Sequence, residues 1–114
     1  MIEHMLQITE IFRDDMNSFA DRIVSNGIID YAYNPLSYAW EPHRAYLEKS
    51  VFRRARTMLL GMNPGPHGMG QMGIPFAATK IVRDLLKIQN LKVSQPRRVH
   101  PRRPVTGLDW PKEE

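Results

Sequence analysis

The segment that most constrains this chain runs from residue 61 to residue 76 and holds five of its seven glycines and three of its nine prolines. So much Gly and Pro excludes a continuous helix or strand, because glycine loses the most entropy on ordering and proline lacks a backbone donor. Directly before it stands Thr57-Met58-Leu59-Leu60, a short apolar run typical of a strand buried on both faces of a parallel sheet. Open α/β sheets place ligand sites in long loops after such strands.

Helices are predicted over three other segments: residues 3–25, 42–50 and 79–88. Gly27 is placed to end the first of these helices, and Thr79 to cap the third. The Met and Phe side chains of the first helix recur at spacings of three and four, which is typical of a face in the core. Residues 31–40 and 89–112 are expected to be irregular or extended, since they are rich in turn residues and Pro.

Several function classes are excluded by composition. The chain contains no cysteine, which rules out disulfides, a thiolate nucleophile and Cys-based metal sites. Its four histidines lack metal-ligand spacing, so no metal site or cofactor is expected. Acidic residues interrupt the amino-terminal apolar positions and no apolar stretch is long enough to span a bilayer, so we expect a soluble intracellular protein without a membrane partner.

Positive charge is concentrated at one end of the chain. Residues 1–79 hold 7 Lys/Arg against 8 Asp/Glu, whereas residues 80–114 hold 9 against 4. A phosphate-facing surface and an ordinary solvated face explain this excess about equally well. The candidate DNA-binding residues are Lys80, Arg97, Arg98, Arg102 and Arg103, which Arg53, Arg54 and Arg56 would extend.

One stretch of the loop has the residue pattern of a dinucleotide-binding fingerprint but not the strand and helix that this motif requires around it. Residues 68–73 follow the pattern G-x-G-x-x-G, but that motif needs its first glycine at the end of the strand and a helix at its last. Here seven residues separate Leu60 from Gly68, and Pro75 interrupts the place where the helix would begin. No Gly-Lys-Ser/Thr closes the loop either, so nucleotide binding by a regulatory fragment is the least favoured hypothesis.

The loop carries a stronger pattern in Gly61-Met62-Asn63-Pro64-Gly65-Pro66, continued by Gly68-Met69, Gln71 and Gly73-Ile74-Pro75-Phe76. Taken alone, Asn-Pro-Gly is an ordinary turn and Phe76 an ordinary core anchor. Together these residues resemble the first catalytic motif of the single-strand-selective monofunctional uracil-DNA glycosylases. Flanking stretches agree, and they extend the resemblance over about residues 30–111: Tyr33-Asn34-Pro35, Tyr38-Ala39-Trp40 and His100-Pro101-Arg102-Arg103-Pro104-Val105.

The resemblance implies a fold and a domain assignment. The fold would be a three-layer α/β/α arrangement around a central parallel sheet, with residues 1–114 as the amino-terminal half or portion of a single glycosylase domain. The family also uses a further Asn and a His-Pro-Ser-Pro-Arg segment, which are absent here. We therefore expect the chain to be truncated at its carboxyl side, poorly folded and inactive by itself.

The resemblance also implies residue roles. Asn63 would be the catalytic residue, holding the water that attacks C1′ of the deoxyribose, and Phe76 would stack on the flipped uracil. Substrate would further be bound by the backbone at Met62 and, on the C5 side, by Gly65 and Met69. This sequence departs from the family at two positions, with His67 in place of Phe and Ala77 in place of Gly.

The implied activity is hydrolysis of the N-glycosidic bond of uracil, and of oxidised uracil derivatives, in single- and double-stranded DNA during base-excision repair. No lysine in the motif is placed for Schiff-base chemistry, so the strand would not be cut. The full-length protein would be a monomer, at the nucleoid in a bacterium or in the nucleus of a eukaryote. The alternative is a non-catalytic DNA-binding remnant that uses the basic residues of segment 80–103.

Overall fold

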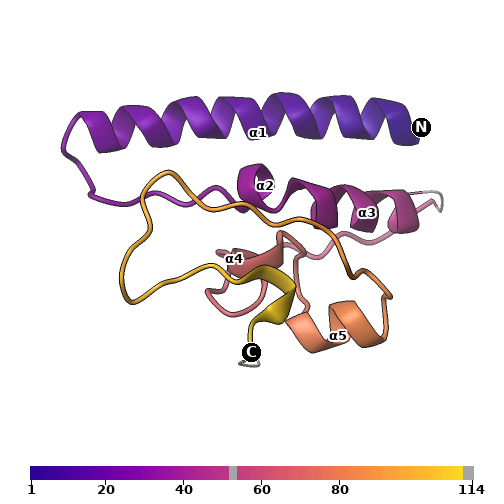
Figure 1. The fold of residues 1–114 in the computed structure, drawn as a ribbon. Helices are drawn as coiled ribbons and strands as arrows, with labels where there is room; N and C mark the ends of the chain where they lie inside the picture. The colour runs from indigo at the N-terminus through magenta and orange to yellow at the C-terminus, as the bar shows by residue number, and fades with distance from the viewer. Residues whose placement is uncertain (52–53, 112–114) are drawn as a thin grey trace.

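The computed structural model describes residues 1–51 and 54–111 (Figure 1). Regular structure in this part of the chain consists of helices and one 3-10 turn: α1 (Ile2–Ser25), α2 (Pro35–Tyr38), α3 (Trp40–Ser50), α4 (Met69–Met72), α5 (Thr79–Asp84) and η1 (Gly107–Asp109). Helices α2 and α3 lie between α1 on one side and the group formed by α4, α5 and η1 on the other (Figure 1). None of the described helices is long and apolar enough to cross a membrane.

The expected three-layer α/β/α fold around a central parallel sheet is wrong for the described residues, which contain no strand. Residues 57–60, the expected buried strand, have no regular structure, and Met58, Leu59 and Leu60 are 75 to 86% exposed. A strand requires backbone hydrogen bonds to a neighbouring strand. No other described segment bonds to the backbone here, so the apolar run stays unpaired and open to solvent.

Helix α1 confirms the first predicted helix almost to the residue. Gly27 ends it as expected, with a φ of +74° that glycine adopts without steric cost. Its nitrogen donates to the carbonyl of Val24 at 3.0 Å, and the nitrogen of Ile28 donates to that of Ile23 at 3.1 Å. This pair of bonds is the Schellman closure, which satisfies carbonyls that the helix would otherwise leave open.

The prediction that α1 buries its Met and Phe side chains is wrong. No residue of α1 is buried, and an apolar stripe stays 39 to 63% exposed: Met5, Ile8, Ile11, Phe12 and Phe19. The helix is held through another face by largely polar contacts. The guanidinium of Arg13 lies 4.8 Å from the ring centroid of Trp40, and Asn17 Nδ2 donates to Ser37 Oγ at 3.1 Å.

Helix α2 replaces part of the connection that was expected to be irregular. Asn34 caps it by accepting a 3.2 Å hydrogen bond from the nitrogen of Leu36, and Pro35 occupies the first turn, where its missing donor costs nothing. Asn34 Nδ2 also donates to the carbonyl of Arg13 at 3.0 Å. One side chain therefore starts α2 and ties it to α1. Helix α3 follows, with Pro42 near its start as predicted.

The core lies beneath the glycine-rich loop. Its larger cluster consists of Met72, Ile74, Val82, Ile88 and Leu108, and its smaller one of Tyr38, Ala39 and Val105. Helix α5 begins at Thr79 as predicted but ends at Asp84, four residues earlier than expected. Thr79 does not cap it, because its Oγ1 donates to the carbonyl of Trp110 at 3.0 Å and so links α5 to the end of the described chain.

Candidate functional site

Loop 61–76 is fastened by one buried carboxamide, that of Gln71, which is 3% exposed. Its Nε2 donates to the carbonyls of Pro66 at 3.1 Å and Pro104 at 2.9 Å. Its Oε1 accepts from the nitrogens of Thr106 at 2.8 Å and Gly107 at 3.2 Å. These four bonds use the full capacity of an amide side chain. Sequence analysis listed Gln71 only as a letter of the motif and missed this role.

The carboxyl-terminal half of the loop is shaped by close backbone approaches. The nitrogen of Gly70 donates to the carbonyl of Gly65 at 2.7 Å, which folds the loop back on itself before α4. Gly73 ends α4 with a φ of +71°, and a Cβ on it would lie 3.1 Å from the carbonyl oxygen of Ala39. Only glycine combines that backbone conformation with that proximity.

His43 supports this turn from helix α3. It is buried, and its Nδ1 lies 2.6 Å from the carbonyl oxygen of Gly73. Because a carbonyl oxygen only accepts, Nδ1 carries the proton and donates it. Burial lowers the pKa of His43 below its ordinary value, and the bond to Gly73 opposes this more weakly. The imidazole is therefore held in its neutral form at neutral pH.

Asn63 and Phe76, the proposed nucleophile holder and stacking platform, both lie at the surface. Asn63 is exposed, and its Nδ2 lies 3.4 Å from the carbonyl of Pro64. Phe76 is 68% exposed, and its Cζ would lie 3.2 Å from a Cβ built on Gly61. The ring thus rests against the backbone of Gly61 at the start of the loop, two residues before Asn63 in the sequence.

The backbone of Phe76 is itself unusual. Its φ is +57°, a left-handed conformation that costs a bulky residue about 1 to 3 kcal/mol. Phe76 combines this strained conformation with an exposed ring. The other predicted substrate contacts differ in exposure: Met62 is 97% exposed, whereas Gly65 and Met69 are half-buried.

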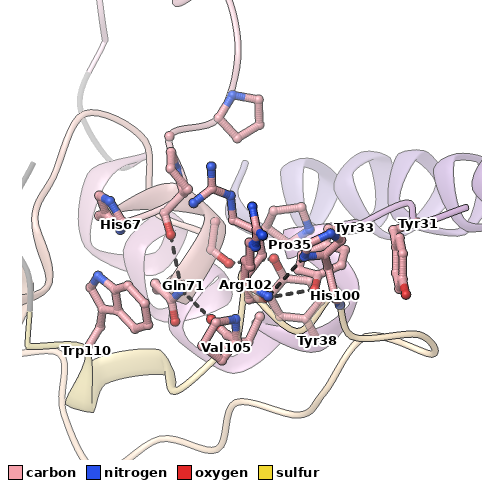
Figure 2. Close-up of a pocket in the computed structure, with 16 residues that line it drawn as sticks. Tyr31, Tyr33, Pro35, Tyr38, His67, Gln71, His100, Arg102, Val105 and Trp110 are labelled. Atoms are coloured by element: carbon pink, nitrogen blue, oxygen red, sulfur yellow. Dashed lines mark hydrogen bonds between the residues drawn. The ribbon is translucent and has the colours of Figure 1, made fainter. Parts of the chain in front are cut away.

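A pocket of about 430 Å³ includes Gly65 among its lining residues; Figure 2 shows Gln71 and the aromatic residues of this pocket. Its walls come from the loop, from the segment before α2 and from the basic segment after residue 99: Tyr31, Tyr33, Pro35, Tyr38, Pro64, Gly65, Pro66, His67, Gly70, Gln71, His100, Arg102, Arg103, Pro104, Val105 and Trp110. Of the predicted site residues it includes Gly65, Arg102 and Arg103. Asn63, Met62, Met69 and Phe76 do not line it.

The pocket has an aromatic wall at each end. His67, which stands where the family has Phe, is stacked on Trp110 with ring centroids 5.4 Å apart and planes at 16°. At the other end the rings of Tyr31 and His100 meet edge to face at 4.9 Å, and the guanidinium of Arg98 lies 5.2 Å from the Tyr31 centroid. Figure 2 shows these two groups on opposite sides of Gln71.

The predicted DNA-binding residues are only partly brought together. Arg98, Arg102 and Arg103 are exposed and lie at or beside the pocket, whereas Lys80 is exposed on α5 and does not line it. Arg97 is engaged by Asp21 at 2.8 Å across the surface. Of the cations that would extend the set, Arg54 and Arg56 are exposed and Arg53 lies outside the described residues. No group of three metal-ligating side chains occurs among the residues that the structure describes.

Comparison with known proteins places this site in a class. No protein-family profile matches the chain. Three curated relatives do match the chain, and each of them is named as a glycosylase of uracil in DNA. The chain is 49% identical over 82 residues to the protein of the rat (Rattus norvegicus) and 46% identical over 82 residues to that of the mouse (Mus musculus). It is 45% identical over 87 residues to that of cattle (Bos taurus).

Each relative is named single-strand selective monofunctional uracil-DNA glycosylase. Over 72 to 76% of its length, the chain is a homologue of these glycosylases, as its loop motif predicted. The chain spans about 30% of the length of the curated relatives that it matches.

Proposed function

We propose that this chain carries the water-positioning and base-stacking part of a uracil-DNA glycosylase, which hydrolyses the N-glycosidic bond of uracil in DNA without cutting the strand. The observation that supports this most is the exposed ring of Phe76, which has a positive φ and rests against Gly61, two positions before Asn63 in the sequence. An exposed aromatic ring and an exposed carboxamide on one loop are the groups that a flipped base and an attacking water require.

Asn63 acts through its neutral amide. Its side-chain oxygen accepts a hydrogen bond from water, which turns a lone pair of the water toward C1′ of the deoxyribose. The bond between C1′ and N1 of uracil breaks with its electron pair on the base, and the water oxygen bonds to C1′ and releases a proton to solvent. Such an oxocarbenium-like reaction needs a positioned water rather than a strong base.

Base recognition is divided between ring stacking and backbone approach. Phe76 stacks on one face of uracil, which contributes about 1 to 3 kcal/mol. The exposed backbone at Met62 meets the polar edge of the base, while Gly65 and Met69 face its C5 side. The proposed partner is uracil-containing DNA, single- or double-stranded, with phosphates contacted by the exposed arginines near the pocket, Arg98, Arg102 and Arg103.

The proposal is tested in a chimera, because the chain spans about 30% of its relatives. Residues 30–111 replace the matching segment of the rat protein, and excision from a uracil-containing oligonucleotide is measured under single-turnover conditions. The chimera should leave an intact strand with an abasic site. Asn63→Ala in the chimera should slow excision by about 100-fold or more, since it removes the group that places the water.

A matched control is Asn90→Gly, which removes another exposed carboxamide at a φ of +60° that glycine adopts freely. Excision by this variant should equal that of the parent chimera. An active chimera whose rate is unchanged by Asn63→Ala would refute the assignment.

Binding of DNA without excision is the second candidate, favoured by the exposed arginines near the pocket. It predicts affinity that falls steeply with salt and does not depend on uracil. Equal binding of uracil-containing and uracil-free strands by the 114-residue chain, together with an inactive chimera, would select it over the glycosylase.

A further inference from the structure

The pocket beside Gly65 is built as a fixed cavity. Tyr33 Oη donates to the carbonyl of Arg103 at 2.8 Å and accepts from the nitrogen of His100 at 2.7 Å. Tyr38 Oη donates to the carbonyl of Gly70 at 2.5 Å. The polar groups of the floor are thus already used within the protein, so they do not select a ligand by hydrogen bonding. The ligand is therefore selected by the shape of the cavity, by its aromatic rings and by its charge.

The rings of this pocket are arranged at its two ends. The stacked pair of His67 and Trp110 forms one end, and the edge-to-face pair of Tyr31 and His100 forms the other. Its volume of about 430 Å³ falls in the range of cavities that hold one small molecule, about 300 to 1,000 Å³. A flat aromatic ligand is what such walls bind best, because it offers a π-face to a neighbouring ring.

The charge at the mouth of the pocket is positive. Arg102 and Arg103 line it, Arg98 lies over Tyr31, and none of the described lining residues is acidic. Asp21, which pairs with Arg97 at 2.8 Å, does not line the pocket. A ligand with a flat ring and an anionic group attached to it satisfies both the walls and the mouth.

We propose that this pocket binds one unpaired nucleotide of single-stranded DNA, next to the nucleotide that enters the Asn63 and Phe76 site. The base lies among the rings, and its phosphate contacts Arg102 and Arg103. The inference rests on the proposed function, since the two sites share the turn at Pro64 and Gly65. A base in a duplex is paired and stacked, so the pocket favours a single strand over a double one.

The test uses the 114-residue chain and a uracil-free deoxyoligonucleotide, so that its outcome does not depend on excision. Trp40→Phe leaves Trp110, in the pocket wall, as the reporter of binding by fluorescence. The single strand should quench Trp110 and bind at least tenfold more tightly than the same sequence closed in a hairpin. Tyr31→Leu should weaken binding by about 5- to 150-fold, the effect of losing one stacking ring.

Arg102→Gln should lower the slope of log affinity against log salt by about 0.7, the value of one phosphate contact on a single strand. Lys49→Gln removes an exposed cation of α3 that lies outside the pocket and outside the predicted DNA-binding residues; it is the control and should leave Trp110 quenching and the hairpin preference unchanged. Tyr31→Phe keeps the ring and adds no second tryptophan, so it should retain the affinity that Tyr31→Leu removes, which separates stacking from a general loss of structure.

Three results would overturn the proposal. The first is equal binding of strand and hairpin. The second is equal weakening by Arg102→Gln and Lys49→Gln, with Trp110 unquenched. The third is full displacement of the strand by inorganic polyphosphate at equal charge, which would show that charge alone is recognised. If Tyr31→Leu loses its fold by circular dichroism, the comparison of Arg102→Gln with Lys49→Gln decides alone. An inactive chimera with a pocket that binds as described would refute the glycosylase and leave nucleotide binding in place.

Discussion

The side-chain amide of Gln71 donates a 2.9 Å hydrogen bond to the carbonyl of Pro104, 33 residues further along the chain. The same amide holds Pro66 on the loop, so it sets the separation between the glycine-rich turn and the basic segment. The pocket between those two segments exists because this carboxamide joins them. Its four partners are backbone groups, two acceptors and two donors, which an amide side chain matches and a carboxylate or a thioether of similar size does not.

Gln71→Met should therefore destabilise the chain strongly. The change keeps the volume but leaves two carbonyls and two backbone nitrogens without their partner. Three of these bonds are partly buried and the one to Gly107 is buried, and each group that water cannot reach costs about 1 to 3 kcal/mol. Urea denaturation followed by circular dichroism measures the loss. Gln95→Met is the control, because exposed Gln95 makes a single bond to the carbonyl of Val105. A loss no larger for Gln71 than for Gln95 would contradict the role given to it.

Gly107→Ala should cost more than Gly27→Ala. Both glycines have a positive φ, of +63° and +74°, so both substitutions meet the left-handed backbone cost of about 1 to 2 kcal/mol. A Cβ on Gly107 would also lie 2.8 Å from the Cβ of Val93, whereas one on Gly27 meets nothing within 4 Å. The added overpacking is worth about 1 to 3 kcal/mol. Equal melting temperatures of the two variants would argue against this packing.

The stability of the chain should fall with pH below about 6.5 through His43. Burial lowers the pKa of the folded imidazole below its ordinary value of 6.5, so the unfolded chain binds more protons as the pH falls. The stabilising effect is complete above 6.5 and declines from there down to the folded pKa. Thermal melts of His43→Gln should lack this decline, while exposed His4→Gln should keep it. A decline of the same size in His43→Gln would place its origin elsewhere.

Phe76→Gly should separate function from stability. Glycine relieves the strained φ of +57°, which offsets its greater entropy loss on folding, so the free energy of unfolding should change by no more than about 1 kcal/mol. Uracil excision by the chimera should fall by about 5- to 150-fold, because the stacking ring is gone. A large loss of stability with full excision would show that the ring packs the loop instead of binding a base.

The helices were predictable where their signals are local. Residues 3–25 carry both the apolar spacing and the terminating glycine, and α1 follows them closely. Asn34-Pro35 contains a cap and a first-turn proline, but the same pair also starts turns, and α2 was missed for that reason. The apolar run at 57–60 shows the limit, since a strand depends on a partner that no short stretch of sequence specifies.

Part of the candidate site could likewise be predicted from the sequence and part could not. Its motif residues could be predicted from their order along the chain, and the three relatives carry the name of the family that the motif resembles. The pocket could not be predicted, because its walls meet only after folding. The contact of His67 with Trp110 and the bonds of Gln71 to residues 33 to 36 positions away have no periodicity that a sequence displays.

Helix α1 should open before the rest of the described chain unfolds. It buries no residue and is attached mainly through side-chain contacts at Arg13, Asn17 and Asp21, so solvent can compete for its attachments one at a time. Amide protons of α1 should therefore exchange with deuterium well before those around Met72 and Val82. Detachment of the helix would leave the loop and its pocket assembled, so the first 25 residues form a separate opening unit from the part that carries the chemistry.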